Sequence, residues 1–336
     1  MAKGLDVGTC FLVGASHTDE SGMGDVQVKS VRDSFLDLEN EQGTRTMLKL
    51  NRVPFIEKDD TLFVIGDAAL RMANILKKEI RRPLSKGVIA AGEREAEKIL
   101  LVLLKEVVGE PSKPGEVVYF SVPASPIDAP MDVVYHEAIF KKILTQLGFT
   151  AVAMNEAAAV VYANAAAENF TAMGISFGAG MSNVALLYQT MIGMKFSCAR
   201  GGDWIDEGAA RATGRLQSQI MAIKEQGVDL LNTRAGDTKT EREREAIVVY
   251  YRNLIHYVVD AIKKEFRKSE SSVQIDSPIP IIISGGTSKA GNFLEFFKQE
   301  FAKIKDFPFE VSEIRMAEDP LADVAKGLLI AASLDD

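Results

Sequence analysis

"LDVGTCFLVG", residues 5–14, is the stretch that decides the fold expected for this chain. An apolar run reaches Asp6, Gly8 and Thr9 and then becomes apolar again, which predicts two strands joined by a tight turn over residues 6–9. Glycine lets a backbone approach a ligand closely, so the turn suits a phosphate whose metal ion faces Asp6. An ordinary hairpin turn has the same pattern, and this stretch alone leaves both interpretations open.

A second turn of this kind lies in "SFGAGMSN", residues 176–183. The small residues Gly178, Ala179 and Gly180 separate two apolar strands and again permit close backbone approach. Two such turns, one from each half of the chain, could hold a polyphosphate from both sides. A pair of hairpins without a ligand is the alternative interpretation.

A third glycine turn, "SGGTSKAG" at residues 284–291, follows a buried strand at 279–283. Gly285 and Gly286 would let a flat base lie against the backbone where a helix begins. A strand-to-helix turn without any ligand explains the same two glycines.

The length of 336 residues suggests about two domains. Strand and helix periodicities alternate along the chain, which predicts an α/β protein. The strand–glycine turn–strand pattern occurs near residue 8 and again near residue 179, which indicates a duplication into two lobes facing a cleft. The expected helices lie at 68–78, 93–108, 129–147, 205–225 and 245–267, with a polar turn at 39–45, strands at 47–56 and 61–70 and a loop at 81–92.

Composition excludes several classes of function. The net charge of −8 argues against a general nucleic-acid-binding surface, because neutralising phosphates needs an excess of Lys and Arg. Cys10 and Cys198 form no pairing or zinc motif, and the three His residues are scattered. The sequence contains neither a signal-peptide pattern nor an apolar run long enough to span a membrane. We therefore expect a reducing, cytoplasmic setting.

The order of these motifs resembles the superfamily of actin, heat-shock chaperones and sugar kinases. "LDVGT" and "SFGAGMSNVALL" resemble its two phosphate loops, "NEAAAVVYANA" its first connecting helix, "IIISGGTSKAGNF" its adenosine loop and "DPLADVAKGLLIAA" its second connecting helix. Five matches in the right order cover essentially the whole chain. "RRPLSKGVIAAGERE" at 81–95 and "ARGGDWIDEGA" at 199–209 are most similar to bacterial and archaeal actin homologues of the MreB type.

This resemblance implies an α/β, actin-like, two-lobed fold. Each lobe would hold a duplicated ribonuclease-H-like sheet with helices, and the nucleotide would lie in the cleft between the lobes. The implied parts are a first core (IA) at 1–35, 70–150 and 318–336, a small subdomain (IB) at 36–69, a second core (IIA) at 151–206 and 276–317, and a helical subdomain (IIB) at 207–275.

The resemblance also implies roles for residues, with ATP or ADP and Mg²⁺ as cofactors. Asp6 would be the carboxylate on the Mg²⁺ side, and Glu156 would orient the attacking water, so these two are the catalytic candidates. A helix N-terminal acid favoured by the helix dipole is the alternative for Glu156. The residues expected to bind the nucleotide are Gly8, Thr9, Cys10, Phe11, Gly178, Ala179, Gly180, Met181, Gly202, Asp203, Lys224, Glu243, Gly285, Gly286 and Thr287.

The chain departs from the family's pattern in the second phosphate loop. Ser176 and Asn183 stand where the superfamily carries carboxylates that order water around the metal ion or near the phosphate. A hydroxyl or an amide can hydrogen-bond to a metal-bound water but carries no charge. We therefore expect nucleotide binding with slow ATP hydrolysis. Asp203 and Asp206 could touch the nucleotide or cap a helix.

The function implied by the resemblance is that of an actin-like cytoskeletal protein, which forms ATP-dependent filaments in the cytoplasm. Its main partner would be further copies of itself, with membrane or adaptor proteins as possible additional partners and no direct contact with nucleic acid. The alternative is a non-polymerising chaperone-like or reactivase ATPase of the same superfamily.

Overall fold

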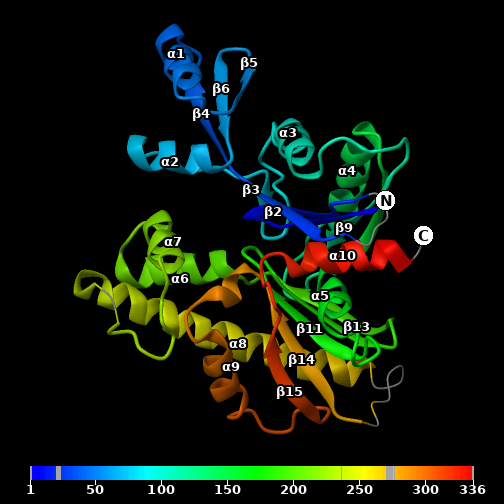
Figure 1. The fold of residues 1–336 in the computed structure, drawn as a ribbon. Coiled ribbons are helices and arrows are strands. Elements are labelled where there is room, and N and C mark those ends of the chain that lie inside the picture. Colours follow the sequence, from blue (N-terminus) through cyan, green and yellow to red (C-terminus); the bar gives the residue numbers. More distant parts are fainter. Residues whose placement is uncertain (1, 20–23, 236, 270–274, 276, 335–336) are drawn as a thin grey trace.

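A computed structural model describes residues 2–19, 24–235, 237–269, 275 and 277–334. Two five-stranded sheets, each with its own helices, stand one above the other in Figure 1, and helix α10 (Asp323–Leu334) runs between them. We call the sheet that contains β1, with its helices and the small sheet above it, the first lobe. The sheet that contains β11, with its helices, is the second lobe. Residues 1, 276 and 336, at which three of the expected domain boundaries fall, lie outside the described residues.

The sheet of the first lobe has the strand order β10-β9-β1-β2-β3. Strands β1, β2 and β3 form an antiparallel meander. Strand β9 pairs parallel to β1, and β10 pairs parallel to β9. The turn of the opening motif therefore lies at the end of β1, with Asp6 inside the strand and Gly8 just beyond it. The strands are β1 Ala2–Val7, β2 Phe11–His17, β3 Val26–Arg32, β9 Val117–Val122 and β10 Thr150–Asn155.

The sheet of the second lobe has the same plan. Its order is β15-β14-β11-β12-β13, again with an antiparallel meander and two parallel strands. This equivalence confirms the two-lobed fold expected from the two repeated glycine turns. The strands are β11 Ala172–Phe177, β12 Ser182–Tyr188, β13 Met191–Cys198, β14 Ile279–Ser284 and β15 Val311–Met316.

Two small-residue helices fill the space between the sheets. Helix α5 (Glu156–Asn164) and α10 belong to one buried cluster that also includes residues of β1 and β12, so both lobes share this core. The helices touch closely at Gly327, where an added Cβ would lie 1.8 Å from the carbonyl oxygen of Ala159. Glycine and alanine at this crossing allow the close approach that leaves the ends of β1 and β11 facing one another.

The outer helices cover the remaining faces. Helices α3 (Ala96–Val108) and α4 (Val133–Gln146) pack on the first sheet through apolar faces. The second lobe carries α6 (Gly202–Thr213), α7 (Gln217–Glu225), the long α8 (Glu241–Ser269) and α9 (Phe293–Phe301), with short 3₁₀ turns at Thr238–Thr240 and Gly286–Lys289. The helical region expected at 205–225 is thus two helices, separated by a left-handed Gly214.

Part of the prediction for residues 35–89 is wrong. The stretch 42–50, expected as a polar turn and the start of a strand, is helix α1 (Gln42–Leu50), in which only Leu48 is buried. It packs with helix α2 (Asp67–Leu76) beside a three-stranded sheet of β4 (Phe35–Glu39), β5 (Phe55–Lys58) and β6 (Thr61–Ile65). The loop expected at 81–92 contains the two short strands β7 (Leu84–Ser85) and β8 (Val88–Ile89). Among the described residues, no helix combines the length and apolarity required to cross a membrane.

Candidate functional site

A cavity of about 410 Å³ lies between the two lobes. It is formed where the ends of β1 and β11, the N-terminus of α5 and helices α6 and α7 meet. Most residues singled out from the sequence line it, although they come from positions as distant as 6 and 287. These are Asp6, Gly8, Thr9, Cys10, Phe11, Glu156, Gly178, Ala179, Gly180, Met181, Asp203, Lys224, Gly285, Gly286 and Thr287.

The two glycine turns at the ends of β1 and β11 have matching geometry. Gly8 N–H donates to the Phe11 carbonyl over 3.1 Å, and Gly178 N–H donates to the Met181 carbonyl over 2.9 Å. The turns also meet across the cleft, because a Cβ on Gly180 would lie 2.5 Å from the hydroxyl of Thr9. Only glycine permits this contact between the lobes.

The third turn closes the cavity from the side of the second lobe. Gly285 has φ +94, and a Cβ there would lie 2.4 Å from the carbonyl oxygen of Phe177, so position 285 requires glycine. The hydroxyl of Thr287 donates to the Gly178 carbonyl over 2.8 Å, which ties this turn to the β11 turn. The hydroxyl of Tyr251, on α8, donates a hydrogen bond to the Thr287 carbonyl over 3.0 Å.

Asp6 and Glu156 place two half-buried carboxylates in the lining of the cavity. The Ser121 hydroxyl donates to Asp6 over 2.8 Å. Glu156 is the first residue of α5, whose N-terminus is capped by the Asn155 side chain accepting from Ala158 N–H over 3.1 Å. Burial raises the pKa of both carboxyls, and the charge of Asp6 raises the pKa of Glu156 further.

Ser176 and Asn183 both contact Glu156. The Ser176 hydroxyl donates to Oε1 over 2.7 Å, and the Asn183 amide donates to Oε2 over 2.8 Å. These hydrogen bonds lower the pKa of Glu156 and thus oppose the effect of burial. The two positions that depart from the superfamily's pattern therefore hold the side chain that the resemblance names as the water-orienting residue.

The carboxylate pair fits a bound cation. Within the part of the chain that the structure describes, no Lys, Arg or His forms an ion pair with Asp6 or Glu156, and two half-buried acids without a cation are costly. The described residues hold no group of three or more His, Cys, Asp or Glu suited to a metal ion. Mg²⁺ commonly takes one or two carboxylates and completes its shell with waters and substrate phosphates, so this arrangement suits that ion.

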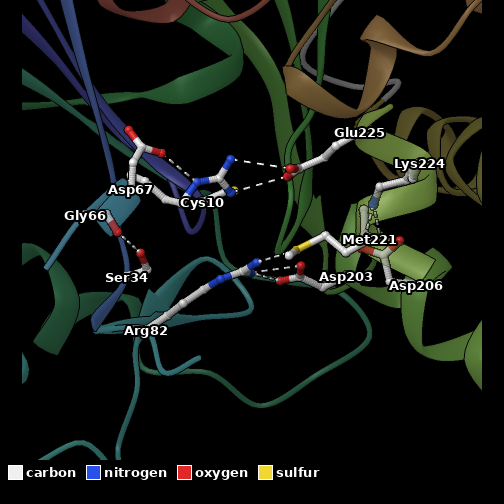
Figure 2. Close-up of polar contacts among 12 residues, drawn as sticks. Cys10, Ser34, Gly66, Asp67, Arg82, Asp203, Asp206, Met221, Lys224 and Glu225 are labelled. Atoms are coloured by element: carbon white, nitrogen blue, oxygen red, sulfur yellow. Dashed lines mark hydrogen bonds and ion pairs between the residues drawn. The ribbon is translucent and has the colours of Figure 1, made fainter. Parts of the chain in front are cut away.

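Charged residues of α6 and α7 also line the cavity, and Figure 2 shows their polar contacts. Asp203 pairs with Arg82 of the first lobe over 2.9 Å, while Lys224 donates to Asp206 over 2.7 Å. Burial raises the pKa of Asp206 to about 6, an effect that the Lys224 ammonium opposes. Neither aspartate caps its helix, because the N-cap is Gly201 and no side chain accepts from the first turn. The helix-cap interpretation of these two residues is therefore wrong.

Two residues named from the sequence do not line the cavity. Gly202 lies directly behind the wall, since a Cβ there would be 2.7 Å from the Thr287 hydroxyl and 2.9 Å from Lys224 Nζ. Glu243 lies on α8 outside the cavity lining, where its carboxylate accepts a hydrogen bond from Arg215 over 2.7 Å. Sequence reasoning missed Arg32, Arg82 and Glu225, which line the cavity. Arg82 lies in the segment at 81–95 that was quoted for its resemblance to MreB-type proteins, and that resemblance is the feature of the sequence that could have drawn attention to Arg82.

Known proteins show the same architecture. The chain is 19% identical to MamK in the structure described as "MamK double helical filament", with a TM-score of 0.70 over 99% of this chain and 98% of that one. It is 16% identical to MreB5 of Spiroplasma citri bound to ADP (TM-score 0.66, covering 99% and 96%). The ethanolamine utilization protein EutJ from Carboxydothermus hydrogenoformans is also 16% identical (TM-score 0.53, covering 98% and 88%).

Identities of this size show the fold and confirm the actin-like architecture expected from the sequence. No curated protein matches the sequence. The family model described as Volactin matches residues 1–332, nearly the whole chain. The chain therefore belongs to the Volactin family and has the two-lobed fold of the actin-like ATPase superfamily.

Proposed function

We propose that this protein binds ATP or ADP with Mg²⁺ in the interlobe cavity and assembles into cytoplasmic filaments. The observation that carries the proposal is that three glycine turns and two half-buried carboxylates line one cavity between the lobes. Structures of the same fold are described as MreB5 bound to ADP and MreB5 bound to AMPPNP, which supports a nucleotide as the ligand.

Each part of the cavity has a proposed role. The backbone of residues 8–11 and 178–181 would lie against the phosphates from the two lobes, with the N–H groups of Gly8 and Gly178 engaged within their own turns. The turn at Gly285 and Gly286 would lie against the adenosine, with Lys224 and Asp203 nearby on the wall. Bound Mg²⁺ would neutralise phosphate charge, and Asp6 is the carboxylate placed to face it.

Slow hydrolysis is the proposed activity. Glu156 is held by Ser176 and Asn183 in the lining of the cavity, where it would orient a water molecule toward the phosphates. Its raised pKa means that at neutral pH this carboxyl carries a proton more readily than an exposed glutamate does. The uncharged Ser176 and Asn183, at positions where the superfamily carries acids, support a low rate.

Filament formation is proposed from the likeness to MamK and MreB5, of which MamK has been described as a double helical filament. Polymerisation would follow if the polymer contact favours the closed arrangement of the lobes that nucleotide stabilises. A MamK variant described as non-polymerising has been solved with AMPPNP bound, so in that protein nucleotide binding does not require assembly. A non-polymerising ATPase is accordingly the second candidate function here.

Thermal unfolding in millimolar Mg-ATP tests the binding step. A ligand that binds only the native state adds RT ln(1 + [L]/Kd), about 2.7 kcal/mol at a hundredfold excess over Kd. We expect a clear rise in Tm that Asp6→Ala largely abolishes. Ser284→Ala is the control, because Ser284 is buried beside the cavity and contacts the Pro320 carbonyl. An unchanged Tm of the wild-type protein would contradict nucleotide binding.

A further inference from the structure

Two ion pairs join the lobes across the cavity. One guanidinium nitrogen of Arg82, in the first lobe, lies 2.9 Å from both carboxylate oxygens of Asp203 on α6, and the other contacts the Met221 sulfur at 3.4 Å. The two terminal nitrogens of Arg32, at the end of β3, lie 3.3 and 3.4 Å from the carboxylate oxygens of Glu225 on α7. In both pairs the cation comes from one lobe and the anion from the other.

These pairs are more enclosed than ordinary surface ion pairs. In the Arg82–Asp203 pair the side chains are 16% and 26% exposed, and in the Arg32–Glu225 pair they are 11% and 38% exposed, so Glu225 is the one member that lies at the surface. Partly buried pairs are screened by salt much less than pairs in open solvent. Separating the lobes would expose both pairs to water, so the pairs oppose that motion.

Arg32 also touches the first glycine turn. Its guanidinium contacts the Cys10 sulfur at 3.3 Å and lies over the Phe11 ring at 4.5 Å. A third bond, to Asp67 over 3.1 Å, ties the same group to helix α2. The Arg32–Glu225 pair therefore links α7 directly to the turn that lies at the end of β1.

All four charged residues line the cavity, so the two pairs connect the walls between which a ligand would lie. We propose that Arg82–Asp203 and Arg32–Glu225 form an interlobe clasp that sets the rate at which nucleotide enters and leaves the cavity. This inference rests on the proposed function for the identity of the ligand, but the clasp itself rests on the ion pairs.

Neighbouring Arg81 supplies a matched control. Its guanidinium binds Asp37 and Glu93, which both belong to the first lobe, and it does not line the cavity. Arg81 is the residue next to Arg82 in the sequence and also has two acidic partners. Arg81→Met therefore removes a comparable arginine without changing a contact between the lobes. Any effect seen for Arg82→Met alone reports the contact across the cleft.

Release of a fluorescent ATP analogue, followed by stopped flow after mixing with excess unlabelled Mg-ATP, tests the clasp. We expect release to be about tenfold faster for Arg82→Met and for Asp203→Asn, and unchanged for Arg81→Met. The double variant Arg82→Met/Asp203→Asn should release the analogue no faster than the single variants, because one interaction is lost in all three. Equal release rates for wild type and both single variants would overturn the clasp while leaving nucleotide binding intact.

Hydrogen exchange of the nucleotide-free protein gives a second readout that needs no ligand. With the clasp broken, the turns at residues 8–11 and 178–181 should exchange several times faster in Arg82→Met than in wild type or Arg81→Met. Unchanged exchange would overturn the clasp. If the wild-type protein binds no ATP analogue yet Arg82→Met shows faster exchange, the proposed function fails, while the ion pairs still hold the two lobes together.

Discussion

Asn183 donates a hydrogen bond from its side-chain amide to Oε2 of Glu156 over 2.8 Å. The hydroxyl of Ser197 donates to the other side of the same amide, which fixes the amide nitrogen toward the glutamate. A position at which the superfamily carries an acid thus serves here to hold another acid in place. Glu156, Ser176, Asn183 and Ser197 thus form one hydrogen-bonded group.

Glu156→Gln should separate hydrolysis from binding. The amide keeps the shape of the side chain but can neither accept a proton nor orient water as a carboxylate does. We expect ATP turnover to fall by about 10²–10⁴, the range typical for loss of a positioned acid or base, while the thermal shift in Mg-ATP persists. Phosphate release measured at saturating ATP checks this, and equal turnover in wild type and variant would exclude Glu156 from catalysis.

Asn183→Asp should destabilise the protein in the absence of divalent ions. The change replaces a donor to Glu156 with a second buried carboxylate beside it, which costs about 1–3 kcal/mol for the lost hydrogen bond alone. We expect a lower Tm in EDTA and a larger rise on addition of Mg-ATP than in wild type. Asn253→Asp is the control, because Asn253 is exposed on α8 and bonds only within that helix. Equal Tm losses in the two variants would contradict the account.

Acid should destabilise the first lobe through His136. This ring is fully buried against Phe140, neither nitrogen has a hydrogen-bond partner among the described residues, and burial lowers its pKa to about 4. The unfolded chain takes up the proton near pH 6.5, so the stability that depends on the neutral ring is full above that pH and is lost as pH falls toward 4. The total effect is about 3 kcal/mol, at about 1.4 kcal/mol per pKa unit.

His136→Leu should therefore flatten the decline of Tm between pH 6.5 and 4. His17→Gln is the matched control, since the His17 ring lies nearer the surface and contacts the Gly24 carbonyl. Parallel pH profiles for wild type and His136→Leu would show that the buried ring does not control acid stability.

Gly327→Ala should be strongly destabilising, because the added methyl group would lie 1.8 Å from the Ala159 carbonyl and force α5 and α10 apart. Overpacking of this kind costs about 1–3 kcal/mol or more. The opposite result is expected for Gly43→Ala in exposed helix α1, where no heavy atom lies within 4 Å, with a gain of about 0.5–1 kcal/mol. Urea unfolding of both variants checks the contrast; a stable Gly327→Ala would mean that the interlobe helices tolerate separation.

The sequence predicted the elements whose periodicity is strong and whose turns contain glycine. The two glycine turns and the two connecting helices lie where the patterns indicated. Helix α1 escaped prediction because only Leu48 is buried, so the exposed Met47 and Leu50 broke the expected helical face. Strand β15 escaped because it lies at a sheet edge and is only half buried.

The site could be predicted only where local motifs carry it. Gly178 and Gly285 belong to turns that are visible in the sequence, and Asp6 lies in the strand just before such a turn. The partner of Arg82 lies 121 positions away and that of Arg32 lies 193 positions away. No local pattern encodes such pairs, because they arise from the way the two lobes face each other. The contact of Ser176 with Glu156 likewise depends on the packing of α5 against β11.

Negative-stain electron microscopy, combined with sedimentation, tests the central claim most directly. Purified protein at tens of micromolar would be examined with and without Mg-ATP, alongside Asp6→Ala. The account predicts filaments that pellet in Mg-ATP for the wild type and are lost or greatly reduced in the variant. Monomers alone, in every nucleotide and salt condition and with a clear thermal shift in Mg-ATP, would contradict the filament proposal and favour the non-polymerising ATPase.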